Sequence, residues 1–257
     1  MTESALMCRD WDERARKDAF YYICTARKDW DPEAFFQSGE ADYRRFVAPV
    51  LAKLRFDPCG KTIFEVGCGA GRMTRSFASR FAHVLALDVS EEMLERARTL
   101  NAQCKNVEWL HGDGHGFPQV PRASADFVFS YLVLQHLPTR NLALGHVDEM
   151  LRVLKPGCPF CFQFNSCPYP TMNWGGRTVW RLLDRLREPV FGLGLQRVGR
   201  GLASLLGWDF LEAGRTWRGA SLGVQDVLET VWKRDGTVRA VVGWDTPMTW
   251  CYGQLPG

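Results

Sequence analysis

The chain has 257 residues, of which 46% are hydrophobic and 24% are charged, and its formal net charge is +3. This length allows one full α/β domain or two small ones, and the composition is typical of a globular enzyme. Such a small net charge argues against a nucleic-acid partner, which usually requires a concentrated basic face.

The sequence predicts neither a signal peptide nor a transmembrane segment. Its first twenty residues mix acids and bases, and no apolar stretch approaches the ~18–20 residues that cross a bilayer. The nine cysteines are odd in number and lack a disulfide-framework spacing. Cys158, Cys161 and Cys167 cluster in the sequence, but the second CxxC pair of a zinc ribbon is missing. We therefore expect reduced thiols, a cytoplasmic location and no metal.

Short apolar runs alternate with helical patterns along most of the chain. An amphipathic helix is predicted at 41–54, and further helices at 73–81, 91–100 and 141–154. The runs between them lack polar alternation, so strands there are expected to be covered on both faces, as in a doubly wound parallel sheet. These predicted strands are 62–66, 84–88, 107–110, 126–134 and 159–164.

The C-terminal part predicts a different connection. A helix over 225–234 precedes two strand-like runs, 238–244 and 249–254, which are separated by the turn signal Asp-Thr-Pro. This spacing favours an antiparallel hairpin at one side of the sheet. We therefore predict a Rossmann-like, doubly wound sheet of seven strands, mostly parallel, in a single domain over 1–257. Its expected parts are N-terminal cap helices (1–54), a core (55–164), an insertion (165–220) and a last helix with the hairpin (221–257).

A glycine-rich loop follows the first predicted strand. In EVGCGAG (65–71), Gly67, Gly69 and Gly71 allow a tight strand-to-helix turn in which the backbone approaches a ligand. Asp88 ends the next strand, 17 residues beyond Gly71. A carboxylate at this place in Rossmann-like folds accepts hydrogen bonds from both ribose hydroxyls. The loop is GxGxG, not the GxGxxG of dinucleotide enzymes, and Glu65 precedes its first glycine by two residues.

With these features the sequence resembles the class I S-adenosylmethionine (SAM)-dependent methyltransferases, and its small-molecule branch most. Five motifs carry the resemblance in order: EVGCGAGRMT, LDVSEEMLERA, GDGHGFP, DFVFSYLVLQHLP and LRVLKPGCPF. The last departs from the usual LKPGG, which is expected to alter a turn and leave the site intact. The resemblance is strong over 41–165 and 221–257 and thin elsewhere.

The resemblance implies SAM as the cofactor and assigns a role to each matching residue. Glu65 and the three glycines would face the methionine part of SAM, and Asp88 its ribose. The remaining roles are Val89 and Met93 beside the adenine, Asp113 and Gly114 at its amino edge, and Tyr131 lining the pocket after the fourth strand.

Methyl transfer needs a base only if the acceptor must lose a proton. His136 is the candidate, because imidazole titrates near neutrality, although it could instead fix the loop into the next helix. His115, Tyr21 and Tyr22 are weaker candidates. The chain lacks the [DNS]PP[YFW] motif of nucleobase amino methylation, a Pro-Cys nucleophile after the fourth strand, and the magnesium-binding Asp of the catechol type.

The acceptor is the open question at this level. Residues 165–220 carry eight arginines against four acids, with four tryptophans, so they could cover a small molecule, a lipid surface or RNA, or be a solvated helical cover. The N-terminal segment around residues 11–23 is expected to form a second flap over SAM. We predict a small-molecule O-, N- or C-methyltransferase. The alternatives are an RNA-modifying methyltransferase, a non-catalytic SAM-fold scaffold and, more distantly, a nicotinamide-dependent oxidoreductase. The sequence does not indicate the oligomeric state.

Overall fold

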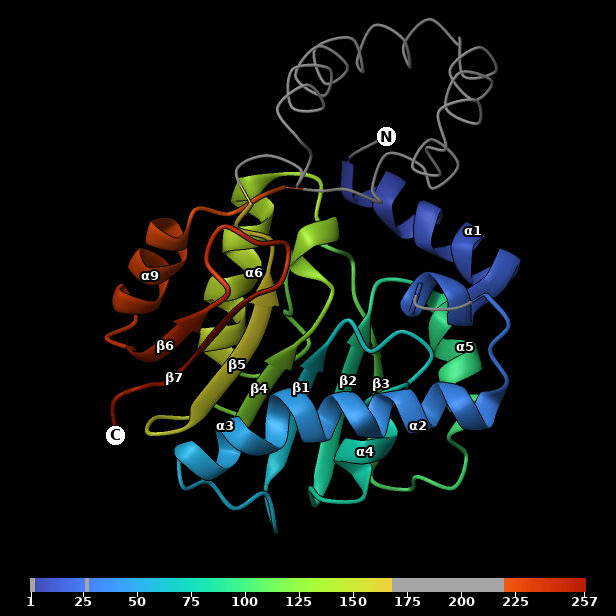
Figure 1. Ribbon diagram of the computed structural model, residues 1–257, viewed down its shortest axis with the longest axis horizontal. Helices are drawn as coiled ribbons and strands as arrows, with labels where there is room; N and C mark the ends of the chain where they lie inside the picture. The colour runs from blue at the N-terminus through green and yellow to red at the C-terminus, as the bar shows by residue number, and fades with distance from the viewer. Residues whose placement is uncertain (1–2, 26–27, 168–219) are drawn as a thin grey trace, which may run out of the picture.

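A seven-stranded sheet organises the computed structural model, which describes residues 3–25, 28–167 and 220–257. The strand order is β3-β2-β1-β4-β5-β7-β6 (Figure 1). The first five strands are parallel, and β7 pairs antiparallel with both β5 and β6. The predicted fold class, a doubly wound sheet with a C-terminal antiparallel hairpin, is confirmed.

The strands follow the sequence prediction closely. They are β1 (Thr62–Val66), β2 (His83–Asp88), β3 (Val107–His111), β4 (Phe127–Ser130), β5 (Pro159–Phe164), β6 (Thr237–Val242) and β7 (Thr249–Gln254).

The fourth strand is shorter than predicted. The apolar run 126–134 suggested one long strand, but β4 ends at Ser130 and a 3-10 turn, η2 (Leu134–His136), follows. Leu132 has a positive φ of 59°, and its backbone N–H donates to the buried Gln163 Oε1 at 3.0 Å. This side-chain acceptor replaces the next ladder hydrogen bond and turns the chain out of the sheet.

Helices cover both faces of the sheet. One face carries α3 (Ala48–Lys53), α4 (Thr74–Ala78) and α5 (Glu91–Leu100), and the other carries α6 (Arg140–Val153) and α9 (Val224–Trp232). Each face encloses its own apolar core, rich in phenylalanine. Figure 1 shows α2 (Pro32–Asp42) and α3 in front of the sheet, with α6 and α9 on the opposite side.

Local sequence explains where several helices begin. The side chains of Asp31, Ser90 and Thr139 accept hydrogen bonds from the backbone N–H three residues on, which caps α2, α5 and α6. The predicted helix at 41–54 continues directly from α2 and includes a π-helical turn, η1 (Tyr43–Val47), before α3.

The N-terminal helix is two helical pieces joined at a kink. In α1 (Glu3–Ile23), Asp18 has non-helical dihedrals (φ −167°, ψ 89°), and its side chain accepts from the Tyr21 N–H at 3.0 Å, as an N-cap does. Figure 1 shows α1 crossing above α5, at the carboxyl end of the parallel strands. The described part of the chain contains no helix long and apolar enough to cross a bilayer.

Candidate active site

The loop after β1 requires glycine for backbone reasons. Gly67, Gly69 and Gly71 have φ values of +76°, +54° and +79°, which side-chain-bearing residues rarely adopt. The N–H groups of Gly67 and Cys68 both donate to the Leu87 carbonyl of β2, at 2.7 and 3.0 Å. The loop is therefore held at the carboxyl end of β1 and β2.

Protein atoms surround the same glycines closely. A Cβ at Gly69 would lie 2.8 Å from Ile23 of α1, and one at Gly71 would lie 2.9 Å from Trp109. A Cβ at Gly67 would collide with Val133, which follows β4. A bulky substitution at Gly67 would therefore strain the loop and its protein neighbours before it met any ligand.

Asp88 closes this loop from the end of β2. Its Oδ2 accepts from the Gly69 N–H at 2.8 Å and its Oδ1 accepts from the Ser90 N–H at 3.0 Å. Burial raises the pKa of Asp88, while the backbone donors at Ser90 and Gly69 lower it. Each carboxylate oxygen keeps a further lone pair, so the group can accept more hydrogen bonds.

Glu65 lies beneath the loop, near the end of β1. It is buried, and its Oε2 accepts from the Thr74 hydroxyl at 2.6 Å. Burial raises the pKa of Glu65 to about 7, against the opposing effects of the Thr74 hydrogen bond and the Arg72 guanidinium. A carboxyl group in this state would take up or release a proton according to the charge of whatever binds beside it.

Of the four residues expected around an adenine, Met93 and Gly114 lie directly against α1. Met93 is 1% exposed and packs with Ala15 and Ala19 of α1, and a Cβ on Gly114 would lie 2.7 Å from Met7. Val89 is half-buried, with His111 Nε2 3.1 Å from its carbonyl oxygen.

Asp113 is exposed, and its Oδ1 accepts from the His115 N–H at 2.8 Å. His115 also lies close to α1, because its Nδ1 is 3.3 Å from the Ser4 hydroxyl.

Two further contacts hold α1 in place, and no local sequence signal identifies them. Asp12 Oδ1 accepts from the Ser90 hydroxyl at 2.6 Å and from the Glu92 N–H at 3.3 Å, at the first turn of α5. Arg16 forms an ion pair with Glu92. The acidic residues at the start of α5 suit the helix dipole, but their role in holding α1 emerges only from the structure.

Tyr131 and His136 both follow β4 but contact different parts of the molecule. Tyr131 contacts Arg72, whose guanidinium lies 5.9 Å from the ring centroid. Burial raises the pKa of Tyr131 to about 12, so this phenol remains protonated at neutral pH. His136 stands edge-on to Trp11 of α1, with ring centroids 5.2 Å apart, and its Nε2 is 3.3 Å from Gln135 Nε2.

Three residues that the sequence interpretation passed over meet at Tyr131. Arg72 pairs with Asp42 at 2.8 Å, while the rings of Phe46 and Trp250 lie 5.4 and 5.1 Å from that of Tyr131. Phe46 comes from the π-helical turn, a feature often found at functional sites. Their sequence positions indicated only a helix and a strand, so nothing in the pattern distinguished them from core residues.

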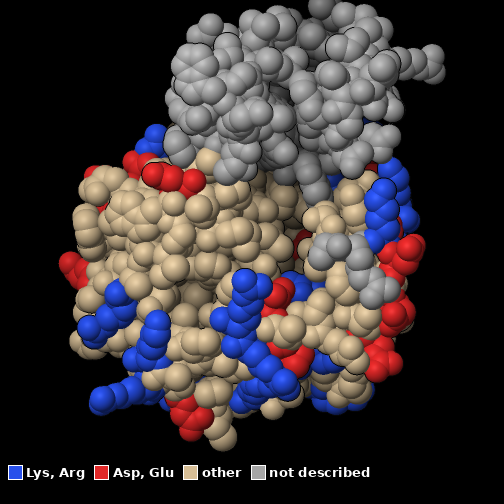
Figure 2. All heavy atoms as spheres, viewed as in Figure 1, with Lys and Arg blue, Asp and Glu red and all other residues tan. Residues whose placement is uncertain are grey.

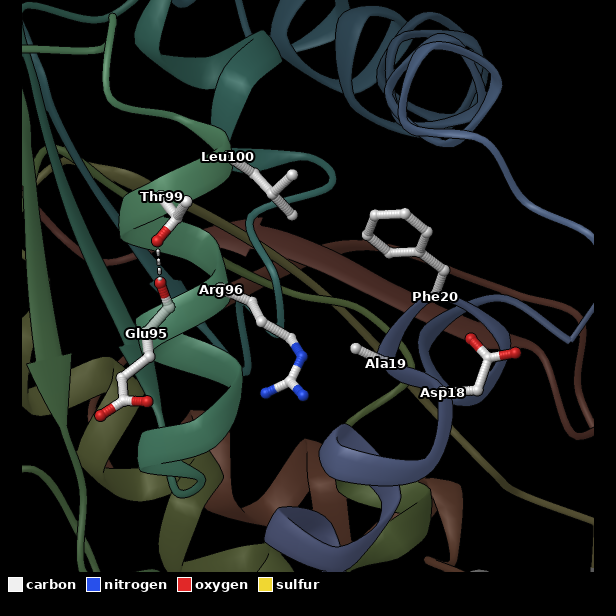
Figure 3. Close-up of a pocket in the computed structure, with 7 residues that line it drawn as sticks. All are labelled: Asp18, Ala19, Phe20, Glu95, Arg96, Thr99 and Leu100. Atoms are coloured by element: carbon white, nitrogen blue, oxygen red, sulfur yellow. Dashed lines mark hydrogen bonds between the residues drawn. The ribbon is translucent and has the colours of Figure 1, made fainter.

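A separate pocket of about 460 Å³ opens between α1 and α5. Figure 3 shows the Arg96 guanidinium extending between the two helices, toward Ala19. None of the predicted site residues lines it; its walls are Asp18, Ala19, Phe20, Glu95, Arg96, Thr99 and Leu100. Within the described ranges, no group of three or more His, Cys, Asp or Glu residues is arranged to hold a metal ion. All nine cysteines are free thiols.

The sequence is similar to those of known proteins. The sequence of residues 63–157 matches the family described as a methyltransferase domain. The biotin biosynthesis bifunctional protein BioHC of Cellvibrio japonicus is 37% identical over 95 residues, covering 37% of this chain and 18% of that protein. A demethylmenaquinone methyltransferase of Clavibacter sepedonicus is 34% identical over 132 residues, covering 51% and 49%. The chain thus spans about half the length of this relative, and less of the first.

Solved structures agree on the fold. The N-methyltransferase NodS of Bradyrhizobium japonicum, in complex with S-adenosyl-l-homocysteine (SAH), superposes with a TM-score of 0.59 at 15% identity, covering 98% of this chain and 99% of that one. A glycine loop after β1, a carboxylate ending β2 and the strand order found here together define a Rossmann-like methyltransferase domain. The sequence match over residues 63–157 and the shared fold support a class I SAM-dependent methyltransferase.

Proposed function

We propose that this protein transfers the methyl group of SAM to an oxygen, nitrogen or carbon atom of a small-molecule acceptor. One observation carries the proposal: the glycine loop, Asp88 and Tyr131 all lie at the carboxyl ends of the parallel strands, next to the boundary between β1 and β4. Connections from these two strands leave toward opposite faces of the sheet, and open α/β sheets bind their ligands at such a switch point.

The residues present suit SAM. Asp88 has free lone pairs for two ribose hydroxyls, and the glycine loop lets the backbone approach the methionine part, with Glu65 below it. Val89 and Met93 would flank the adenine, and Asp113 and Gly114 would lie at its amino edge. Since α1 already contacts Met93 and Gly114, it would form the outer wall of that pocket.

When bound, SAM supplies a sulfonium-activated methyl group, so the chain's task is to align acceptor and cofactor. Tyr131 would line the transfer point as a neutral phenol, because its pKa is far above neutrality. His136 would accept a proton where the acceptor has one to lose, with its ring orientation set by Trp11. The alternative role for His136 is to hold η2 against α1.

A small-molecule acceptor is favoured over RNA by the small net charge and by relatives named for demethylmenaquinone and biotin biosynthesis. The basic, Trp-rich segment that could favour RNA or a lipid surface falls almost wholly on residues 168–219, outside the described residues. RNA modification therefore stays the rival, as does a scaffold that binds SAM without catalysis.

The first test is calorimetry with SAH, SAM and NAD, followed by transfer of labelled methyl groups into fractionated small molecules, RNA and protein. We expect one SAM or SAH per chain and no comparable heat with NAD. Asp88→Ala should weaken SAM binding by roughly 1.5–3 kcal/mol, the range for losing hydrogen bonds to a charged group. Asp57→Ala removes an exposed carboxylate ahead of β1 and should leave the affinity unchanged.

Other outcomes would contradict the proposal in distinct ways. Tight NAD binding without SAM binding would remove the methyltransferase assignment. Label that enters only RNA, with activity lost to ribonuclease and collapsing as salt rises, would move the acceptor to RNA, because phosphate contacts release counterions. SAM binding with no transfer into any fraction would favour the scaffold.

A further inference from the structure

An apolar strip runs from the glycine loop across the sheet face to its β6 edge. It consists of Tyr131, Phe46, Trp250 and Val242, and we call it the aromatic track. Tyr131 directly follows β4, Phe46 belongs to the π-helical turn, and Trp250 and Val242 belong to the C-terminal hairpin of β7 and β6, so three distant parts of the sequence contribute.

Ring contacts and strand register connect the track without a gap. Ser130 is in register with Val66, so Tyr131 comes level with Gly67, the first glycine of the loop. The ring of Trp250 stacks on Tyr131 at 5.1 Å and on Phe46 at 4.8 Å. Val242 pairs with Trp250 across β6 and β7, so the two side chains share one face of the sheet.

The far end of the track is open to solvent. Val242 is 55% exposed, and Trp244 just beyond it is 58% exposed. Figure 2 shows a broad area without Lys, Arg, Asp or Glu side chains on this face, over the part of the sheet formed by β6 and β7. Large exposed apolar side chains within an uncharged area of this kind are candidates for a binding site.

Charge at the inner end restricts what can bind. The Arg45 guanidinium lies 5.0 Å from the Phe46 ring centroid, and Arg72 lies 5.9 Å from that of Tyr131. Asp42 neutralises Arg72, whereas Arg45 is exposed. A positively charged head group would be repelled here, and a neutral or anionic one would not.

We propose that the acceptor has a planar aromatic hydroxyl or carboxyl head and a hydrocarbon chain, and that the chain lies along the aromatic track. The head would lie at Tyr131, level with the glycine loop, and the chain would extend past Trp250 toward Val242. This inference rests on the proposed function, because it names the acceptor class of the same site. Phe46, Trp250 and Val242 are then specificity-determining residues.

The test uses 4-n-alkylphenols with chains of one to six carbons, titrated by calorimetry into the 257-residue chain with and without saturating SAH. Apolar burial should lower the dissociation constant by about two- to fourfold for each added methylene. Val242→Asp should flatten this dependence at the longer chains, because a carboxylate would lie in the path of the alkyl group, and Val242→Thr should largely retain it. A 4-alkylbenzylammonium series should bind more weakly than phenols of equal chain length.

Trp232→Ser is the matched control, because Trp232 is an exposed apolar residue of α9, on the opposite face. It should keep the chain-length dependence of the wild type, and SAH binding reports whether each variant is folded. The track would be overturned if the dissociation constants of the wild type did not depend on alkyl chain length, or if Val242→Asp left that dependence unchanged. Either result would leave the proposed function in place. If sedimentation shows that the wild type is a dimer and that Val242→Asp is not, and if the phenol series is unchanged, then this face is a contact between two copies of the chain instead. Failure of SAH to bind the wild-type protein would count against the proposed function, not against the track.

Discussion

Glu65 combines a buried position with a pKa close to neutrality. The carboxyl group of the folded protein titrates at about 7, above its ordinary 4.5, because burial disfavours its charged form. A raised folded-state pKa contributes stability that is present below pH 4.5 and is lost as the pH rises through about 7. The free energy of unfolding should therefore fall over this pH range, because the folded protein must ionise a buried carboxyl group.

The isosteric variant Glu65→Gln isolates this effect, because its carbonyl oxygen can still accept from Thr74. Relative to the variant, the wild-type protein should lose up to roughly 3 kcal/mol of unfolding free energy between pH 4.5 and pH 8. Urea unfolding at several pH values measures the difference. A constant offset at every pH would mean that Glu65 stays ionised in the folded protein.

His136 lies against Trp11, so its two candidate roles can be separated by kinetics. If His136 is the general base, His136→Ala should lower turnover by about 10²–10⁴-fold with SAM affinity retained, and the wild-type rate should fall as the pH drops through the imidazole titration. His83→Ala, which alters a histidine at the start of β2, is the control. A flat pH profile with a small loss of rate would assign His136 to holding η2.

At the residue scale the sequence predicted what lies in contiguous motifs. The tight turn at the three glycines and the strand end at Asp88 could be predicted, because the backbone of such a turn restricts residue type at fixed spacing. Phe46, Trp250 and Asp12 could not, because their positions depend on which distant segments pack together. The glycines themselves carry a second constraint that the sequence did not indicate, since Ile23 and Val133 close over them.

Among the elements, α1 is the one that would cover the proposed adenine pocket. Asp12 ties it to the first turn of α5 through Ser90 and Glu92. Asp12→Ala should cost about 1.5–3 kcal/mol of local stability, as expected for a hydrogen bond to a charged group, so amide exchange in α1 should accelerate roughly tenfold or more. Hydrogen exchange with mass spectrometry measures this.

Glu13→Ala is the control for α1, because its ion pair with Arg9 is exposed and lies within the same helix. Equal acceleration in both variants would mean that α1 is held by its apolar contacts alone.

The elements predicted most accurately are those with a single dominant pattern. The bounds of β1, α5, β5 and β7 agree with the sequence prediction residue for residue. The run after Asp126 was overextended because apolar character alone does not reveal that Gln163, on a neighbouring strand, captures the Leu132 N–H. The Asp18 kink was not predicted, because the N-terminal segment was assigned only as cap helices, with no bounds for each helix.

For the molecule as a whole, a ligand at the switch point would join α1, the glycine loop and the segment after β4. Binding to the folded state alone stabilises it by about 2.7 kcal/mol at a hundredfold excess over the dissociation constant. SAH at that concentration should therefore raise the Tm by roughly 5–10 °C for a chain of this size. Differential scanning calorimetry measures the shift, and NAD at equal concentration should give none. A shift with NAD equal to that with SAH would contradict the assignment of the site.

At this scale, strand–helix alternation and the terminal hairpin were enough to predict the sheet class. The position of β7 between β5 and β6 was not predicted. Which hairpin strand pairs with β5 depends on how the hairpin packs against the rest of the sheet, and no local sequence pattern indicates this.

That order also affects how the sheet can assemble. β7 follows β6 in the chain, yet it lies inside the sheet, and β6 has no other partner among the described strands. A nascent chain that has reached β6 therefore has an unpaired strand and an open β5 edge until residues 249–254 emerge. The two strands would then dock on β5 as a preformed hairpin. A premature stop before residue 249 would delete β7 and leave β6 without a strand to pair with, so the sheet would lose both. The edge of β5 would then be exposed to aggregation.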